Sequence, residues 1–265
     1  MDKPKYLVMH LNGGLGNQLF QVASGYCLAK SRDKRFAVKN ILRSNHSQID
    51  YWENIFRKIP IKNDDFTEVF REPDDKFTIC LEDIPSFSDS DSVMWGFFQN
   101  ENYFIHDRQN ILELFEIESY RKEYLDTKYP SYSRGCFIHY RRKDYVHNEE
   151  YNIVTDEYFK SCIQEMQVKH PTCVFFVFSD DIPYAESLEY LKTLSQVIFV
   201  KEDEVNCMYL MSMCFYGGIG TNSSFSWWGG WLNQNPDKTV FYPDKWLGER
   251  PGLDIWWKGC EKRNR

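Results

Sequence analysis

The sequence lacks several features that would assign it to a specialised class of protein. No apolar run approaches the ~20 residues that a membrane-spanning helix needs, and the first residues lead straight into a strand-like segment without the layout of a signal peptide. We therefore expect a cytoplasmic protein without a transmembrane segment, either free in solution or peripheral to a membrane. With 14 glycines and 10 prolines, the chain is neither collagen-like nor of low complexity.

Cysteine pairs of the kind found in metal sites are absent, and so is positive net charge. None of the eight cysteines forms a C-x-x-C pair or a Cys/His cluster at zinc spacing. We expect them to be small buried side chains in a reducing compartment. The net charge of −7 argues against a general nucleic-acid binder. What the chain does have is an aromatic content of 17% and 265 residues, enough for two domains.

Strand-like and helix-like segments alternate along the chain, and in the second half they predict a doubly wound parallel sheet. The expected strands are 6–11, 36–38, 93–98, 135–140, 174–178, 197–200, 216–220 and 239–242. The expected helices are 17–30, 103–115, 156–169, 184–194, 204–214 and 225–232. Residues 44–92 are polar and interrupted by prolines, which predicts loops around short elements. Residues 126–133 have the composition of a linker, so we expect domains at 1–128 and 129–265.

Ligands of parallel α/β sheets bind where the strands end at their carboxyl side. After the first strand comes a glycine-rich loop, Gly13-Gly14-Leu15-Gly16-Asn17-Gln18. Glycines let the backbone approach a ligand closely, and the helix that follows offers free N–H groups. No Lys-Ser/Thr pair follows as in a P-loop, and Leu19 occupies the third glycine position of the dinucleotide fingerprint. A tight strand-to-helix turn explains the glycines equally well.

Two adjacent arginines follow strand 135–140. Because side chains alternate along a strand, His139 and Arg141 are expected on one face, and Arg142 on the other or in the loop. Guanidinium groups bind phosphate through two parallel hydrogen bonds, so the pair predicts a phosphate site in which Asp144 holds one arginine in place. The alternative is a solvated basic loop with an internal ion pair.

Two further strand ends carry polar clusters. Asp180 and Asp181 follow strand 174–178 and can accept hydrogen bonds from a nucleobase or ribose, and they can also cap the next helix. The segment Thr221-Asn222-Ser223-Ser224 precedes helix 225–232, where hydroxyls and free N–H groups predict an anion site.

Other motifs indicate surface features. The D-x-D spacing of Asp89 and Asp91 occurs in metal-dependent sugar transferases, but no buried strand precedes it, and we interpret it as a solvated loop. The sequon Asn45-His46-Ser47 stays unmodified without a signal peptide. We therefore predict no metal site.

Together, the four strand-end clusters indicate a nucleotide-diphosphate ligand, and a nucleotide sugar fits all of them. The chain resembles the alpha-1,2-fucosyltransferase family, glycosyltransferase family eleven, over nearly its whole length. The segments that carry the resemblance are L-N-G-G-L-G-N-Q-L-F-Q at 11–21, W-G-F-F-Q-N-E-N-Y-F at 95–104, H-Y-R-R-K-D-Y at 139–145, V-F-S-D-D at 177–181 and T-N-S-S-F-S-W-W at 221–228.

The resemblance implies an α/β, GT-B-like fold with two Rossmann-like halves facing a cleft. It implies an inverting transferase that moves L-fucose from its donor co-substrate GDP-β-L-fucose to the 2-hydroxyl of a galactoside, with no required metal or other cofactor. The implied partners are this nucleotide sugar and a galactose-containing glycan acceptor. The chain is short for two full halves, so the N-terminal half is expected to be reduced. Residues 44–92 match no family motif, which leaves the acceptor open.

By motif match, the resemblance also assigns site residues. Arg141 would bind the donor diphosphate, Asp180 or Asp181 would meet the guanosine, and the serines after Asn222 would meet the phosphates. The implied catalytic set is Arg141, His139, Asp144 and Asn17. The implied donor-binding set is Gly14, Gly16, Arg142, Asp180, Asp181, Asn222, Ser223 and Ser224. Candidates for a general base are His147, Glu149 and Glu150, and the sequence does not choose among them.

Two other functions stay open at this point. An inverting transferase of another deoxysugar, such as rhamnose, would need the same phosphate site. A carbohydrate-binding lectin would use the aromatic residues and would need no diphosphate site.

Overall fold

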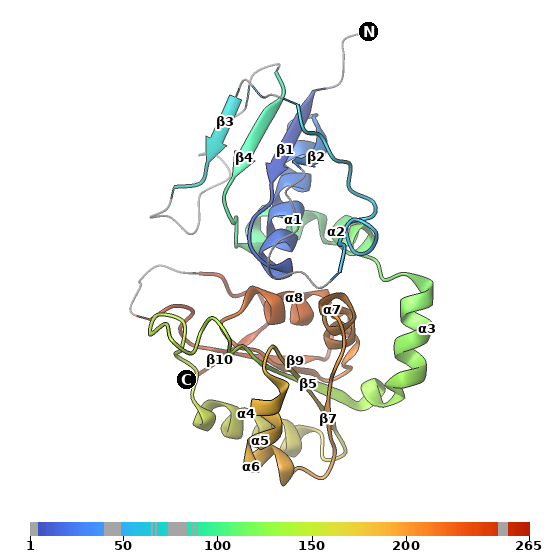
Figure 1. Ribbon diagram of the computed structural model, residues 1–265, viewed down its shortest axis with the longest axis vertical. Coiled ribbons are helices and arrows are strands. Elements are labelled where there is room, and N and C mark those ends of the chain that lie inside the picture. Colours follow the sequence, from blue (N-terminus) through green and yellow to red (C-terminus); the bar gives the residue numbers. More distant parts are fainter. Residues whose placement is uncertain are drawn as a thin grey trace. The chain divides into compact units, whose positions relative to one another are not determined.

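The chain folds into two compact units. The computed structural model describes residues 5–39, 49–64, 66, 68–73, 84–85, 87, 90–248 and 254–265. The first unit comprises residues 1–116 with 252–255, and the second comprises residues 117–251 with 256–265. Each unit contains one parallel sheet (Figure 1). The division after Glu116 precedes by 12 residues the boundary that we expected after residue 128.

The first unit contains a four-stranded sheet of order β2-β1-β4-β3, in which all pairs are parallel. Its strands are β1 (Tyr6–His10), β2 (Arg35–Lys39), β3 (Glu68–Arg71) and β4 (Ser92–Trp95). Helix α1 (Leu15–Ser31) packs closely on one face, because a Cβ atom on Gly25 would lie 2.6 Å from the Phe36 ring. The short helices η2 (Glu101–Tyr103), η3 (Ile105–Asp107) and α2 (Arg108–Leu114) complete this unit.

The second unit contains a six-stranded parallel sheet of order β10-β9-β8-β5-β6-β7. The strands are β5 (Gly135–Tyr140), β6 (Val174–Ser179), β7 (Val197–Phe199), β8 (Gly217–Ile219), β9 (Thr239–Pro243) and β10 (Glu261–Arg263). The helices are α3 (Ser119–Lys128), η4 (Pro130–Arg134), α4 (Asp156–Lys169), α5 (Ile182–Ser187), α6 (Glu189–Lys192), α7 (Glu204–Met213) and α8 (Ser224–Leu232). Figure 1 shows α4, α5 and α6 on one face of this sheet and α7 and α8 on the other.

The direction of strand addition reverses between β5 and β8. From β5 the chain adds β6 and β7 on one side, and it then returns to add β8, β9 and β10 on the other. Such a reversal leaves a crevice at the carboxyl ends of the two central strands. Glycine allows these strands to pack closely, since a Cβ atom on Gly218 would lie 2.3 Å from the Phe137 ring. The topology therefore places a ligand crevice after Tyr140 and Ile219.

Aromatic residues fill much of the core. Trp227 and Trp228 are fully buried, as expected, and Trp231 stacks on Trp227 with a centroid distance of 6.1 Å. Of the seven cysteines in the described ranges, all are free thiols and five are buried. The expectation of small buried side chains is confirmed for these five, whereas Cys207 and Cys260 are half-buried. No helix in the described ranges combines the length and apolarity that a membrane span requires.

Four secondary-structure expectations are wrong. The strand expected at 93–98 ends at Trp95, because Gly96 and Phe98 have positive φ values that do not continue a strand. Residues 126–133 are not a linker, because α3 continues to Lys128 and η4 follows, held by an ion pair of 2.6 Å between Lys128 and Glu202. The helix expected at 103–115 begins only at Arg108, after two 3-10 turns. The helix expected at 184–194 is two short helices, because Leu188 between them has an extended backbone. Two short edge strands, β3 and β10, have no apolar alternation and were not anticipated.

Candidate functional site

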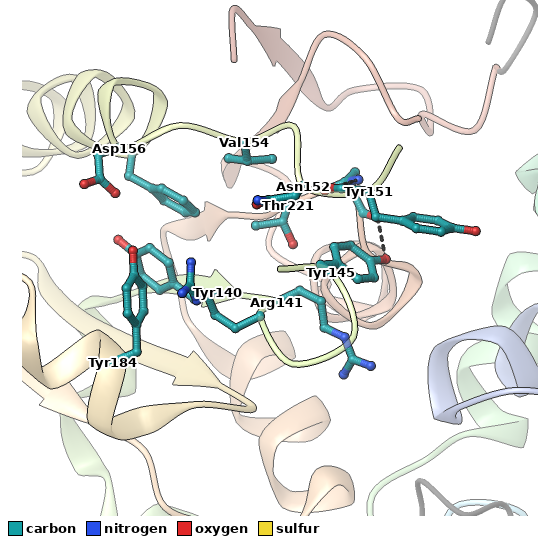
Figure 2. Close-up of a pocket in the computed structure, with 12 residues that line it drawn as sticks. Tyr140, Arg141, Tyr145, Tyr151, Asn152, Val154, Asp156, Tyr184 and Thr221 are labelled. Carbon is teal, nitrogen blue, oxygen red and sulfur yellow. Dashed lines mark hydrogen bonds between the residues drawn. The ribbon is translucent and has the colours of Figure 1, made fainter. Parts of the chain in front are cut away.

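A pocket lies at the carboxyl ends of β5 and β8, where the topology places a crevice (Figure 2). It encloses about 390 Å³, counting the space at its open mouth. Its lining is rich in tyrosine and contains both predicted arginines. The lining residues are Tyr140, Arg141, Arg142, Tyr145, Tyr151, Asn152, Val154, Asp156, Phe159, Tyr184, Thr221 and Asn222. All belong to the second unit.

Arg141 is paired with two carboxylates. Its Nη2 lies 2.7 Å from Oδ1 of Asp144, and its Nη1 lies 3.0 Å from Oδ2 of Asp180. Burial lowers the pKa of the guanidinium, but these two carboxylates outweigh it, so the net pKa is raised. The ion pair expected between Asp144 and one arginine is therefore present. Asp144 is half-exposed, whereas Asp180 is largely buried, so the second pair is screened less by solvent.

Asp180 holds the loop that carries the arginines. Its Oδ1 accepts a hydrogen bond of 2.8 Å from the backbone N–H of Arg142, and its Oδ2 pairs with Arg141. Both oxygens therefore contact the loop after β5. Asp181 has a different place, as the N-cap of α5, where its Oδ1 accepts from the backbone N–H of Tyr184 at 3.2 Å. The capping interpretation thus holds for Asp181, and a role for either carboxylate toward guanosine stays a prediction.

Arg142 takes a different direction from Arg141. Its guanidinium carbon lies 3.5 Å from the centre of the Tyr184 ring, a close cation–π contact. Its Nε is buried and has no hydrogen-bond partner within the part of the chain that the structure describes. Figure 2 shows Tyr184 at one end of the pocket and Tyr145 and Tyr151 toward the other. The two arginines therefore offer their charge to different parts of one pocket.

His139 is buried beneath this loop. Its ring packs against Phe225 with a centroid distance of 5.5 Å, and its Nδ1 lies 3.4 Å from the hydroxyl of Thr221. Burial, and then the charge of Arg141, lowers the pKa of His139 to about 3. The imidazole is therefore neutral at physiological pH, and it links β5 to the segment after β8.

The segment after β8 is held by its own polar side chains. Nδ2 of Asn222 donates to the backbone carbonyls of Tyr151 at 3.0 Å and Trp246 at 2.9 Å. Ser223 is the N-cap of α8, and its Oγ accepts from the backbone N–H of Phe225. Ser224 is the first residue of that helix. The N-terminus of α8 therefore adjoins the pocket, whose lining includes Thr221 and Asn222, and an anion site there stays a prediction.

Sequence reasoning gave no role to two residues that line the pocket, Tyr145 and Tyr151, or to Ser226, which contacts the pocket residue Thr221. Tyr145 donates from its hydroxyl to the carbonyl of Asn222 at 3.1 Å, the dashed line in Figure 2, and its ring packs on Tyr151. Buried Ser226 accepts from the backbone N–H of Thr221 at 3.3 Å. Tyr145 lies inside a segment that carries the family resemblance, so that segment held a usable signal. Nothing in the sequence marked Tyr151.

The remaining site residues lie in the first unit. Gly14 is the N-cap of α1, Gly16 is buried within that helix, and Oδ1 of Asn17 accepts from Nε2 of Gln99 at 2.8 Å. Gly13 has a φ of +79°, and a Cβ atom there would lie 2.6 Å from Nδ2 of Asn17. This loop therefore requires glycine at one position for its backbone conformation.

Two glutamines that sequence reasoning missed shape the same loop. Nε2 of Gln18 donates to the carbonyl of Gly13 at 2.8 Å, and Oε1 of Gln21 accepts from the backbone N–H of Asn12 at 2.9 Å. Nε2 of Gln21 also donates to the carbonyl of Gly96 at 2.9 Å. Both glutamines occur in the segment of family resemblance, and their spacing of one turn on the helix puts them on one face.

The candidates for a general base and the D-x-D residues make none of the contacts described above. His147 and Glu149 are exposed, and Glu150 is half-buried in the loop after Asp144. Asp91 accepts from the backbone N–H of Tyr6 and pairs with Lys62, while Asp89 lies outside the described residues, as does the sequon at 45–47. Within the described ranges, no three His, Cys, Asp or Glu side chains gather closely enough to hold a metal ion.

Sequence comparison gives the relatives of this chain. It matches the family Glycosyl transferase family 11 over residues 2–246. It is 30% identical over 283 residues to an alpha-1,2-colitosyltransferase of Escherichia coli, covering 94% of each chain. It is 26% identical over 288 residues to the O-antigen biosynthesis glycosyltransferase WbnK of Escherichia coli, covering 89% of this chain and 93% of that protein.

Solved structures share the fold at low sequence identity. The fucosyltransferase NodZ from Bradyrhizobium is 13% identical with a TM-score of 0.56, covering 86% of this chain and 93% of that one. POFUT1, in a complex with GDP-fucose, is 12% identical with a TM-score of 0.54, covering 91% and 98%. The predicted α/β, GT-B-like fold class is thereby confirmed. The chain belongs to glycosyl transferase family 11, the family that its motifs resemble.

Proposed function

We propose that this glycosyltransferase moves L-fucose, with inversion, from GDP-β-L-fucose to the 2-hydroxyl of a galactoside. The observation that carries the proposal is that two neighbouring arginines, Arg141 and Arg142, line one pocket at the point where the strand order reverses. Two guanidinium groups suit a diphosphate, since each can donate two parallel hydrogen bonds to phosphate oxygens. NodZ soaked with GDP-fucose has the same fold, and this supports a nucleotide-sugar donor.

The chemistry of the transfer fits this arrangement. A single displacement at the anomeric carbon places negative charge on the departing β-phosphate. Arg141 would stabilise that charge, because the carboxylates of Asp144 and Asp180 hold its guanidinium before the reaction begins. The N-terminus of α8, with Ser223 and Ser224, would add backbone N–H groups and hydroxyls to the same phosphates.

The two units would divide the substrates between them. In this proposal the second unit binds the donor, and the first unit binds a galactose-containing acceptor. We also propose Gly14, Gly16 and Asn17 of the first unit as functional residues. The low pKa of His139 keeps its imidazole neutral. In this proposal His139 therefore positions Thr221 and the loop after β5, and it carries no charge to the donor. We propose that the reaction needs no metal ion or other cofactor, with GDP-fucose as donor co-substrate.

A second donor deserves equal testing, because a relative at 30% identity is named an alpha-1,2-colitosyltransferase. Colitose is a 3,6-dideoxy sugar, so it differs from fucose by one hydroxyl. The diphosphate contacts proposed here are common to both donors. An enzyme specific for colitose would have to reject the additional hydroxyl of fucose, and the residues that do so would lie at the sugar end of the pocket.

A donor screen tests the proposal. The protein is incubated with lactose, a chelator and either GDP-fucose or the colitose nucleotide, and released GDP and product linkage are measured. We expect a 2-linked fucosyl product that forms equally well with chelator, and competition by GDP but not by UDP or TDP. Transfer of colitose alone would reassign the donor. Loss of activity with chelator would contradict the metal-free reaction, and absence of GDP binding would refute the site itself.

A further inference from the structure

The four strands of the first unit end in a single row of side chains. His10 on β1 is in register with Lys39 on β2, and Arg71 on β3 is in register with Trp95 on β4. The pairing of Met9 with Met94 places His10 beside Trp95. Residues at one register level of a parallel sheet point to the same face. We call Lys39, His10, Trp95 and Arg71 the strand-end row, and Figure 1 shows their strands side by side.

The side chains of the strand-end row pack on one another. The His10 ring stacks on Trp95 with centroids 3.4 Å apart and an interplanar angle of 14°. The guanidinium of Arg71 lies over the Trp95 ring at 4.5 Å, and the Lys39 ammonium lies over the Phe66 ring at 5.6 Å. Packing on aromatic rings holds these cationic groups at the carboxyl end of the sheet while leaving N–H groups for other partners.

The row carries positive charge that no carboxylate of the described residues neutralises through an ion pair. Within the described residues, neither Lys39 nor Arg71 has an ion-pair partner, whereas Arg141 in the second unit has two. Glu72, the carboxylate next in sequence, uses its Oε2 to accept from the backbone N–H groups of Phe97 at 2.7 Å and Phe98 at 2.9 Å. In a chain of net charge −7, these two cations, which have no ion-pair partner among the described residues, form a local excess of positive charge.

The pKa of His10 also responds to the positive charge of the row. Burial, followed by the charges of Lys39 and Arg71, lowers the pKa of His10. The imidazole is therefore neutral at physiological pH and can donate one N–H. Its Nδ1 is buried and lacks a hydrogen-bond partner among the described residues. Every polar group of the row can therefore donate a hydrogen bond to an oxygen acceptor.

We propose that the strand-end row binds an anionic group, a carboxylate or a phosphate, carried by the acceptor glycan. The carboxyl edge of a parallel sheet is where such sheets bind ligands. Arg71 would bind the anion through its guanidinium fork and Lys39 as a point charge, on either side of His10 and Trp95. This inference rests on the proposed function, and it narrows the acceptor to a charged galactoside.

The test compares three acceptors with a galactosyl 2-hydroxyl. They are methyl β-galactoside, a disaccharide in which the same galactoside is linked to a uronic acid, and the galactoside carrying an alkyl diphosphate. We expect the KM of one anionic acceptor to be at least about tenfold below that of the neutral one. Whether the uronate or the diphosphate binds better identifies the source of the anion. Equal KM values for all three would overturn the proposal.

Variants locate the effect on the row. Arg71→Gln and Lys39→Gln should each raise the KM for the preferred anionic acceptor about tenfold, with kcat and the KM for methyl β-galactoside unchanged. Arg35→Gln is the matched control, because Arg35 lies on the same face of β2 at the opposite end. If Arg35→Gln and Arg71→Gln behave alike, the row is not the site.

A binding measurement separates this inference from the proposed function. Methyl galacturonide and galactoside phosphate are titrated into the wild type and Arg71→Gln, with no donor present, and binding is followed by NMR. Saturable binding that Arg71→Gln abolishes would support the row even if GDP-fucose proves to be the wrong donor. Normal GDP binding with no anion binding by the row would refute the inference alone.

Discussion

The carboxylate of Asp180, after β6, lies 3.0 Å from the guanidinium of Arg141, after β5. The two strands pair in register from Gly135 with Val174 to Tyr140 with Ser179, so the residues that follow them emerge side by side. Asp180 also accepts the backbone N–H of Arg142. One carboxylate therefore sets both the direction of Arg141 and the path of the loop that carries it.

Replacing Asp180 should impair turnover more than replacing Asp144. Asp180→Asn keeps an oxygen for the N–H of Arg142 but loses the charge that holds Arg141, so we expect kcat to fall about tenfold. Asp144 is half-exposed, and Asp144→Asn should change kcat less than about threefold. Steady-state kinetics with GDP-fucose measure both. Equal effects of the two variants would mean that Asp180 does not position Arg141.

Removing Arg141 should abolish most of the rate. Arg141→Ala removes a donor to the departing phosphate, and such a loss costs ~2.7–4 kcal/mol, or about 100- to 1,000-fold in turnover. Arg141→Lys should also be poor, because a lysine cannot pair with two carboxylates and phosphate in the same geometry. Single-turnover measurements at saturating donor check both variants. Near-normal turnover in Arg141→Ala would contradict the assignment.

Removing the Asn222 amide should destabilise the fold. Asn222→Ala leaves the carbonyls of Tyr151 and Trp246 without their donor in a buried site, which should lower the free energy of unfolding by about 2–4 kcal/mol. Urea denaturation measures the change. Asn152→Ala is the control, because Asn152 is exposed and its Nδ2 makes one weak hydrogen bond of 3.4 Å, so its effect should stay below about 0.5 kcal/mol.

Acidification should weaken the fold through His139. Its pKa is about 3 in the folded chain and near the ordinary 6.5 when unfolded, so the unfolded state binds the proton first as the pH falls. Stability is therefore lost between pH 6.5 and 3, by about 3 kcal/mol at pH 4 from this group. His139→Gln should flatten that dependence, whereas His147→Gln, at an exposed position, should not. If the free energy of unfolding of His139→Gln depends on pH in the same way as that of the wild type, the effect does not come from His139.

Glu72 should give the free energy of unfolding the opposite dependence on pH. Burial raises its pKa to about 7, against the lowering effect of the two backbone N–H donors. The folded state therefore binds the proton more tightly, and stability falls as the pH rises from 4.5 to 7. Glu72→Gln stays neutral, so it should be more stable than the wild type at pH 8 by about 2–3 kcal/mol and nearly equal at pH 4.5. Glu113→Gln, at an exposed site, serves as control in the same denaturation series.

The ends of β5 could be predicted from the sequence because a glycine and a charged residue mark them. Strand β5 has the expected bounds, since an apolar run lies between a glycine and Arg141, and α4 likewise agrees at both ends. The sequence offered the arginine pair, Asn222 and the serines after it as candidates because polar residues follow buried strands at that edge, and the structure places the two arginines and Asn222 in the lining of one pocket. These signals are local, and a single segment suffices to read them.

What the sequence could not predict depends on register and on packing between distant segments. The partners of Asp180 follow from the pairing of β5 with β6, and the row of Lys39, His10, Trp95 and Arg71 follows from three strand pairings at once. β3 was missed because Glu68–Arg71 is a short edge strand without a periodic pattern. Residues 126–128 read as a linker because the ion pair of Lys128 with Glu202 spans 74 residues.

The amide of Asn222 joins three separate segments, its own, the one at Tyr151 and the one at Trp246, by contacts within the chain. A pocket assembled in this way has little ordering left to do when a nucleotide enters, so the conformational entropy lost on association should be small. Calorimetry should then find a heat-capacity change no larger than the apolar area of the nucleotide itself accounts for, without the added contribution of loops folding around it.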